Sequence, residues 1–128
     1  MAWAASCGSI TIRPFAQQHG SIVSLGYRVQ DFAYSCDLSG IPEGSLAAVS
    51  GLDVWIIDAL RPTPHPSHLS LPETLALIEQ QTPRQAVLTN LHIDMDYATI
   101  DGVTPVHVTP AFDGMRIDIT GGEIIRPR

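Results

Sequence analysis

Apolar and polar positions near the start of the chain follow the pattern of β-strands. Residues 9–15, SITIRPF, alternate between the two kinds of side chain, as a half-buried strand requires. Residues 22–29 and 32–35 are rich in β-branched and aromatic side chains, with Gln30-Asp31 between them. The pattern therefore predicts one strand followed by a β-hairpin whose turn lies near residues 30–31.

The next segment combines a short helical pattern with a buried strand. Residues 41–49 contain Pro42-Glu43, which favours a first helical turn, and predict a helix. Residues 53–58, DVWIID, are apolar on both faces of a strand. Such a run is typical of a strand in the middle of a sheet.

A proline-rich loop precedes the strongest helical signal in the chain. Residues 61–68, RPTPHPSH, contain three prolines and can form neither a helix nor a strand ladder. Ser70 then begins a helix, because Glu73 three residues later completes a capping-box pattern. Pro83 marks the end of that helix.

The remaining elements are shorter and continue the alternation of strands and helices. They are a strand at 86–88, a helix at 95–100, and strands at 106–108, 115–119 and 123–125, with turns at Asp113-Gly114 and Gly121-Gly122. The helices interspersed among the strands predict an α/β fold. A length of 128 residues allows one domain, residues 1–128, with a modest core.

The charge of the chain limits its partners. The net charge is −6, and all seven basic residues are arginines. Such a surface repels nucleic acid and anionic lipid as a whole, so neither is an expected partner. The longest apolar stretch is too short to span a bilayer, and residues 1–10 lack the pattern of a signal peptide. We therefore expect a cytoplasmic protein.

The two cysteines do not form a recognisable framework. Cys7 and Cys36 are too few and too far apart for a disulfide scaffold or a zinc knuckle. Both are expected to be free thiols, and Cys36 is expected to be a small buried side chain.

Imidazole and carboxylate groups occur repeatedly where predicted strands begin or end. His19 precedes a strand, Asp37 follows one, and Asp58 closes one. His68 lies in the proline-rich loop just before a helix, and His92 follows the strand at 86–88. These side chains are the ligands that zinc, manganese or iron prefer.

Four segments resemble the later motifs of the metallo-β-lactamase-fold hydrolases, in the same order. They are QHGSIVSLGYRV, AYSCDLSGIPE, GLDVWIIDALRPTPHPSHLSLPETLALIEQ and AVLTNLHIDMDY. The phosphoribosyl cyclic phosphate phosphodiesterase type, akin to the tRNA-processing zinc endonucleases, is the most similar branch. The resemblance covers about residues 9–119 and implies the C-terminal half of a four-layer αββα sandwich.

The resemblance also implies a role for each of the five residues. His19 resembles a ligand of one metal, Asp37 a carboxylate that bridges two metals, and His92 a ligand of the second metal. His68 resembles the histidine that contacts the scissile phosphate and protonates the leaving oxygen. Asp58 resembles an aspartate outside the ligand shell that orients a histidine. The complete family site holds two divalent ions, Zn or Mn, and its substrate here would be a small phosphodiester.

One family motif is absent from the sequence. The HxHxDH string, which supplies most of the ligands, does not occur, and HPSH is not a substitute for it. Each metal would keep one histidine and the shared Asp37, whereas zinc sites normally use three or four protein ligands. We therefore expect weak or no metal binding and no hydrolase activity from these residues alone.

Half a sandwich exposes a sheet face and a strand edge that a partner would cover. The expected partner is the missing N-terminal half or a second copy in a homodimer. Two alternatives stay open. A non-catalytic remnant would act as a homo-oligomeric binding or assembly module, and an unrelated α/β ligand-binding domain would lack the sandwich topology.

Structural interpretations also stay open for single residues. His92 could cap a helix or lie on the surface, Asp37 could form a turn, and His68 could flank the following helix. The remaining polar residues near these motifs are interpreted as loop, surface or helix N-terminal groups: Arg61, His65, Asp94, Asp96 and His107.

Overall fold

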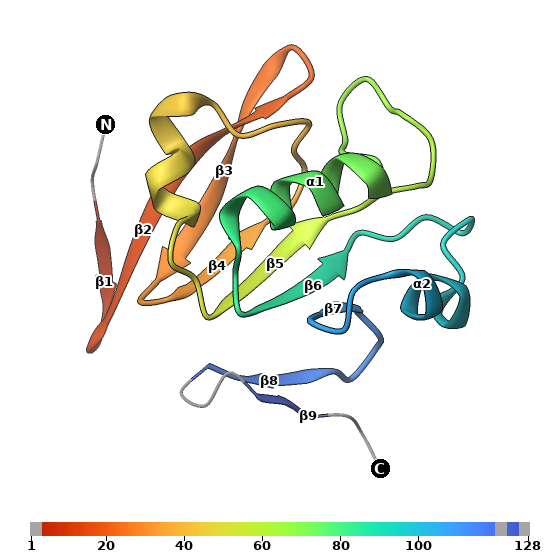
Figure 1. Ribbon diagram of the computed structural model, residues 1–128. Helices are drawn as coiled ribbons and strands as arrows, with labels where there is room; N and C mark the ends of the chain where they lie inside the picture. The colour runs from red at the N-terminus through yellow and green to blue at the C-terminus, as the bar shows by residue number, and fades with distance from the viewer. Residues whose placement is uncertain (1–3, 120–122, 126–128) are drawn as a thin grey trace.

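A mixed β-sheet forms the centre of the molecule. The computed structural model describes residues 4–119 and 123–125, and in this part of the chain seven strands pair in sequence order (Figure 1). Strands β1 to β4 are antiparallel, and β4 to β7 are parallel. The strands are β1 (Ala5–Cys7), β2 (Ile10–His19), β3 (Ile22–Val29), β4 (Phe32–Ser35), β5 (Val54–Asp58), β6 (Gln85–Thr89) and β7 (Val108–Pro110). A separate hairpin joins β8 (Arg116–Asp118) to β9 (Glu123–Ile125).

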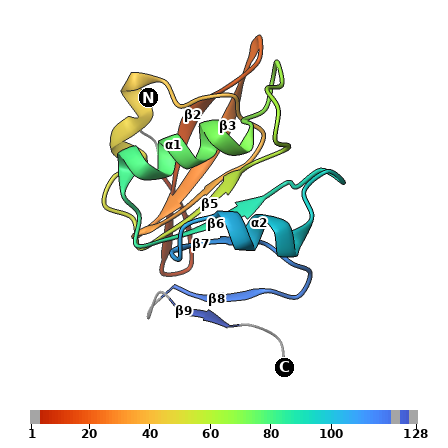
Figure 2. The same cartoon turned by 45° about the vertical axis from the view of Figure 1, so that its right-hand side comes forward.

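Helical segments cover one face of this sheet. The 3-10 helix η1 (Glu43–Val49) and the helix α1 (Leu71–Gln81) lie over the same face in both views (Figures 1 and 2). The short helix α2 (Tyr97–Val103) lies beside β7. The fully buried Trp55 lies in the core between the sheet and these helices, with Ile57, Ile78 and Leu88. This arrangement confirms the α/β class.

The parallel half of the sheet brings three loops to one edge. Ser35 at the end of β4 pairs with Ile57 of β5, and Asp58 at the end of β5 pairs with Thr89 of β6. The segments after β4, β5 and β6 therefore leave the sheet side by side. These are the segments in which the sequence placed Asp37, His68 and His92.

The predicted hairpin is confirmed with its bounds. Strands β3 and β4 pair antiparallel, Val29 opposite Phe32, and Gln30 in the turn has φ 51°. The preceding strand is longer than predicted, and a turn with Gly8 at φ 61° separates it from β1. His19 is consequently the last residue of β2 and does not merely precede a strand.

Two predicted helices differ from their observed form. The segment predicted as a helix at 41–49 is the 3-10 helix η1, which begins at Glu43. The helix predicted at 95–100 begins at Tyr97, because the Asp96 side chain accepts a hydrogen bond from the Thr99 N–H and ends the preceding loop.

The strands near the C-terminal end are displaced from their predictions. Strand β7 begins at Val108, since a turn in which the Val108 N–H donates to the Pro105 carbonyl occupies the positions predicted as strand. Val106 is fully exposed there. Strand β8 is shorter than the predicted 115–119. The turn predicted at Gly121-Gly122 lies outside the described residues.

The face of the sheet opposite η1 and α1 carries exposed apolar side chains. Val23, Leu25 and Tyr27 of β3 are 70%, 45% and 42% exposed, and Tyr34 of β4, paired with Tyr27, is 39% exposed. No helix in the described part of the chain lies over this face of β3 and β4 in either view (Figures 1 and 2). We call this set of four residues the open face.

None of the helices among the described residues has the length and apolar character needed to cross a bilayer.

Candidate functional site

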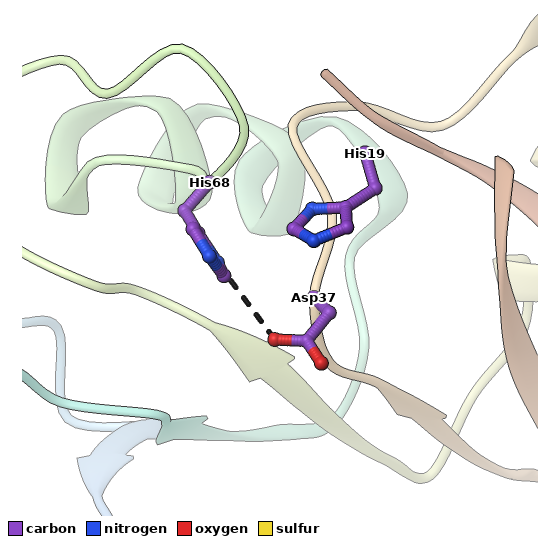
Figure 3. A group of neighbouring side chains, drawn as sticks. All are labelled: His19, Asp37 and His68. Carbon is purple, nitrogen blue, oxygen red and sulfur yellow. Dashed lines mark ion pairs between the residues drawn. The ribbon is translucent and has the colours of Figure 1, made fainter. Parts of the chain in front are cut away.

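Three side chains from separate segments converge at the edge where the parallel strands end. His19 ends β2, Asp37 follows β4, and His68 lies in the loop between β5 and α1. Each offers one potential ligand atom, and these atoms lie within 4.8 Å of one another. Figure 3 shows the three side chains turned toward a common space. We call this group the triad.

The backbone at Asp37 has an uncommon conformation and is fixed by hydrogen bonds from two other strands. Asp37 has φ 57°, in the left-handed region that aspartate tolerates better than most residues. The Gln17 amide donates to the Cys36 carbonyl at 3.2 Å, and the Ser24 hydroxyl donates to the Asp37 carbonyl at 2.6 Å. The Asp37 side chain remains 59% exposed. Its carboxylate is thus available while its main chain is fixed.

His19 is oriented by the loop that contains His68. The Nδ1–H group of His19 donates to the Ser67 carbonyl at 2.6 Å, which leaves Nε2 as the available ring nitrogen. The ring centroids of His19 and His68 are 4.8 Å apart, with an interplanar angle of 74°. Because Ser67 directly precedes His68, one short piece of chain positions both imidazoles.

A buried carboxylate lies behind His68. Asp58 is fully buried, and its Oδ2 atom lies 2.9 Å from His68 Nδ1 and accepts a weaker bond from the Leu38 N–H at 3.4 Å. The Thr74 hydroxyl of α1 donates to the Asp58 carbonyl at 2.5 Å. Asp37 Oδ1 lies 3.9 Å from the same His68 nitrogen, the approach dashed in Figure 3. Asp58 therefore orients the imidazole of His68, which leaves its Nε2 available.

His92 does not belong to the triad. It follows β6 at the same edge of the sheet, and its N–H donates to the Leu60 carbonyl at 2.8 Å. Its side chain is 49% exposed, and its Nδ1 lies 3.3 Å from Asp94 Oδ2. The structure thus brings His19 and Asp37 together with His68, while His92 faces its own neighbour in the loop.

The sequence interpretation overlooked His65 as a neighbour of the triad. Its ring centroid is 5.1 Å from that of His68, and the Ser67 N–H donates to its Nδ1 at 3.2 Å. Partial burial lowers the pKa of His65, and electrostatic interaction with Arg61, His68 and His19 lowers it further. The HPSH spacing, with two histidines three residues apart, was the signal for this proximity.

Cys36 lies beside the buried carboxylate. It is half-buried rather than buried as predicted, with its Sγ atom 3.9 Å from Asp58 Oδ1. Burial raises the pKa of its thiol, and burial also raises the pKa of Tyr34 to about 12. Both groups are neutral at physiological pH.

The triad has the donor chemistry of a transition-metal site. Two imidazoles and one carboxylate suit zinc or manganese. Metal-binding histidines usually donate their second ring N–H to a carboxylate or a main-chain carbonyl. His68 does so to Asp58 and His19 to Ser67. The residues present therefore fit a divalent cation.

Comparison with known proteins assigns the family. A model of the beta-lactamase superfamily domain matches residues 2–93. The chain therefore belongs to this superfamily, and its mixed sheet with flanking helices corresponds to part of the metallo-β-lactamase fold.

Individual relatives are similar over part of their length. A diphosphatase of the PhnP family superposes with a TM-score of 0.85 at 29% identity, over 88% of this chain and 44% of that structure. The short form of human tRNase Z gives a TM-score of 0.70 at 19% identity, over 92% of this chain and 47% of the enzyme. Zinc-bound PqqB from Methylobacterium extorquens gives 0.68 at 13% identity, over 92% and 53%. The last two similarities concern the fold alone.

One curated sequence relative is much longer than this chain. An octanoyltransferase of Porphyromonas gingivalis (strain ATCC BAA-308 / W83) is 25% identical over 109 residues. The match includes 83% of this chain but 22% of the octanoyltransferase. The chain therefore spans about a fifth of that protein and about half of each solved structure.

Proposed function

We propose that the chain forms part of the active site of a metal-dependent hydrolase of the phosphodiesterase type. The observation on which this depends is the convergence of His19, Asp37 and His68 at one sheet edge, with Asp58 behind His68. The 29% identity to a diphosphatase of the PhnP family supports phosphate chemistry as the class of reaction. The substrate that we propose is a small phosphodiester.

In the complete site, His19 and Asp37 would hold the metal ions, with Asp37 shared between both. When bound, two divalent cations, zinc or manganese, activate a water molecule and stabilise negative charge on the phosphoryl group. His92 is proposed as a ligand of the second ion. It faces Asp94 at 3.3 Å, so we expect its side chain to turn when the remaining ligands are present.

His68 is proposed as the general acid. Asp58 holds Nδ1–H of this histidine at 2.9 Å, so Nε2 is the nitrogen that faces a substrate. A protonated Nε2 can donate to the leaving oxygen as the phosphorus–oxygen bond breaks. The buried Asp58 carboxylate keeps the ring in one orientation.

The remaining ligands are proposed to come from an N-terminal half with the HxHxDH motif, which these 128 residues lack. The open face supports this proposal, because an exposed apolar patch of neighbouring side chains is typical of a surface that another part covers. We accordingly propose that these residues alone do not hydrolyse phosphodiesters.

The test is a reconstitution experiment. The 128-residue chain is assayed with Zn²⁺ or Mn²⁺ and bis(p-nitrophenyl) phosphate, alone and after mixing with the part of the PhnP-family diphosphatase that this chain does not cover. We expect turnover only in the mixture. His68→Ala should lower that turnover by at least about 100-fold. His107→Ala is the matched control and should leave turnover unchanged. Absence of turnover in every mixture, or full turnover with His68→Ala, would contradict the proposal.

The open face also favours a second candidate, a homo-oligomeric assembly module without catalysis. In that case the chain would form a stable oligomer through Val23, Leu25, Tyr27 and Tyr34. It would show no turnover with any complementary half. Reconstituted activity would rule this candidate out.

A further inference from the structure

We propose that Gln17 is a positioning residue, which fixes the direction of the Asp37 carboxylate from the buried side of β2. Gln17 lies two residues before His19 in the same strand, and it is 1% exposed. It does not belong to the triad, so its effect on the reaction passes through Asp37. The inference rests on the proposed function where turnover is measured, whereas its first test uses the isolated chain without metal.

Two peptide carbonyls determine where the Asp37 side chain points. Peptide groups are planar, so the backbone at Asp37 has two free torsions, φ and ψ. The plane that contains the Cys36 carbonyl lies on one side of the Asp37 Cα atom, and the plane that contains the Asp37 carbonyl lies on the other. The Gln17 Nε2 group donates to the first carbonyl at 3.2 Å, and the Ser24 hydroxyl donates to the second at 2.6 Å. With both planes held, the Cα–Cβ bond of Asp37 has a fixed direction.

Gln17 also acts on the second carbonyl, through Ser24. The two residues are opposite each other in the β2–β3 pair, and Gln17 Nε2 donates to Ser24 Oγ at 3.2 Å. A hydroxyl group has a single proton to donate. Because the amide N–H points at Ser24 Oγ, the hydroxyl proton is directed away from the amide and to the Asp37 carbonyl. One NH₂ group therefore controls both peptide planes.

The conformation held in this way is one that Asp37 does not adopt readily. At φ 57° a Cβ atom lies close to the main chain, which costs energy for residues other than glycine. The Leu38 N–H, in the peptide after Asp37, donates to Asp58 Oδ2 at 3.4 Å, which is long for a hydrogen bond. The shorter bonds from Gln17 and Ser24 therefore keep Asp37 in the left-handed region.

The chemistry of the amide explains why glutamine occupies this buried position. Its Nε2 group donates both to Ser24 Oγ and to the Cys36 carbonyl, which can only accept. Its Oε1 atom has no hydrogen-bond partner among the described residues, and a Cβ atom at Gly26 would lie 2.5 Å from it. A buried carbonyl without a partner destabilises a fold, so stability alone does not explain the amide. The two donated bonds do.

The first test compares Gln17→Met with the unaltered chain by NMR in the absence of metal. Methionine has a similar volume, and it removes both the N–H donors and the unpaired carbonyl. At positive φ the HN and Hα atoms of a residue are close, so the intraresidue nuclear Overhauser effect of Asp37 is strong in the unaltered chain. We expect a weaker effect in Gln17→Met, with an unchanged far-UV circular dichroism spectrum.

Gln18→Met is the matched control for this measurement. Gln18 is the neighbouring glutamine, and its exposed side chain lies on the opposite face of β2. It should keep the strong Asp37 signal. Ser24→Ala is a second variant, at a position that is only half-buried, and it decides the question if Gln17→Met does not fold. It removes the bond to the Asp37 carbonyl and should weaken the same signal.

The second test measures turnover in the reconstituted mixture. Gln17→Met and Ser24→Ala should each lower kcat by about 10–100-fold. KM should change little, because Asp37 acts on the reacting group and not on the remainder of the substrate. Gln18→Met should leave both constants unchanged. A strong Asp37 signal in Gln17→Met and Ser24→Ala, or an unchanged kcat in a mixture that turns over, would overturn the proposal. If no mixture turns over, the hydrolase proposal fails and the NMR comparison still decides whether Gln17 positions Asp37.

Discussion

At the scale of single residues, the arrangement of the site depends on groups that do not themselves face the common space. Asp58 is fully buried and holds His68, and the Ser67 carbonyl holds His19. A buried charged group is stable when it is hydrogen-bonded on several sides. Asp58 meets this condition through His68, Leu38 and the Cys36 thiol.

Replacement of Asp58 should therefore destabilise the whole fold as well as the site. Asp58→Asn keeps the size of the side chain but removes the charge that accepts the His68 N–H. We expect the free energy of unfolding to fall by about 1–3 kcal/mol, measured by urea denaturation. The exposed Asp94→Asn is the control, with an expected change within about 0.5 kcal/mol. Equal effects of the two substitutions would contradict this account.

Asp96 gives the protein a defined dependence on pH. The Thr99 N–H, and then the Thr99 hydroxyl, donate hydrogen bonds that hold the pKa of Asp96 below its ordinary value of 3.8. At pH values near 3.8 and just below it, the folded state therefore binds fewer protons than the unfolded state. The stabilisation is complete above pH 3.8 and is lost as the pH falls through the lower folded-state pKa.

Asp96→Asn separates the charge from the cap, because asparagine also caps helices. Urea unfolding between about pH 5 and pH 2 should show a smaller loss of stability in the variant than in the unaltered protein. If the free energy of unfolding depends on pH equally in both proteins, the Asp96 carboxylate contributes nothing to the loss of stability at low pH.

At the scale of elements, the β2–β3 hairpin depends on one position without a side chain. Gly26 faces Phe15 across the pair, and Gln17 lies on the same face of the sheet. A Cβ atom at Gly26 would overlap the Phe15 ring and lie 2.5 Å from Gln17 Oε1. Phe15 and Gln17 are 8% and 1% exposed, so neither can move freely. Gly26 thus makes room for the amide that holds the chain next to Asp37.

Gly26→Ala is expected to destabilise the protein by about 1–3 kcal/mol through overpacking. Gly44→Ala is the matched control, since a Cβ atom at Gly44 meets nothing within 4 Å and lies in η1. Alanine is favoured over glycine in a helix by roughly 0.5–1 kcal/mol, so Gly44→Ala should be neutral or stabilising. Thermal denaturation of the two variants compares them directly, and a similar loss in both would contradict the argument from packing.

At the scale of the whole molecule, the sheet is covered on one side and apolar on the other. The helices η1 and α1 lie over the face that contains Trp55 and Phe15. The open face presents Val23, Leu25 and the two paired tyrosines to solvent. Burial of such a surface contributes about 25 cal/mol per Å² of apolar area, so contact with another sheet or a second copy is favourable.

The open face should therefore cause association of the isolated chain. Light scattering coupled to size-exclusion chromatography is expected to show an oligomer for the unaltered chain and a monomer for the double variant Val23→Glu and Tyr27→Glu. Val106→Glu, at a fully exposed apolar position away from this face, should behave like the unaltered chain. A monomer at all concentrations, or dissociation by Val106→Glu as well, would exclude a role for the open face.

The sequence by itself determined the elements and the kind of chemistry. Local signals predicted β3, β4, the central strand β5 and the start of α1, because turn residues, apolar runs and a capping box act within a few positions. Motifs in a known order indicated the superfamily, which the match over residues 2–93 confirms. The observed bounds of the short strands and of the helix near residue 97 differ from the predicted bounds. Hydrogen bonds of single residues such as Asp96 decide where these elements begin and end.

The tertiary structure alone decided which candidate residues meet. His19 and His68 are 49 positions apart, and the register of β2 and the path of the proline-rich loop bring their rings to 4.8 Å. The same parallel register buries Asp58 behind His68 and carries Asp37 to the triad, while a bend after β6 leaves His92 beside Asp94. Spacing along a chain cannot predict such distances, because they depend on how strands pair and on where the loops between them turn.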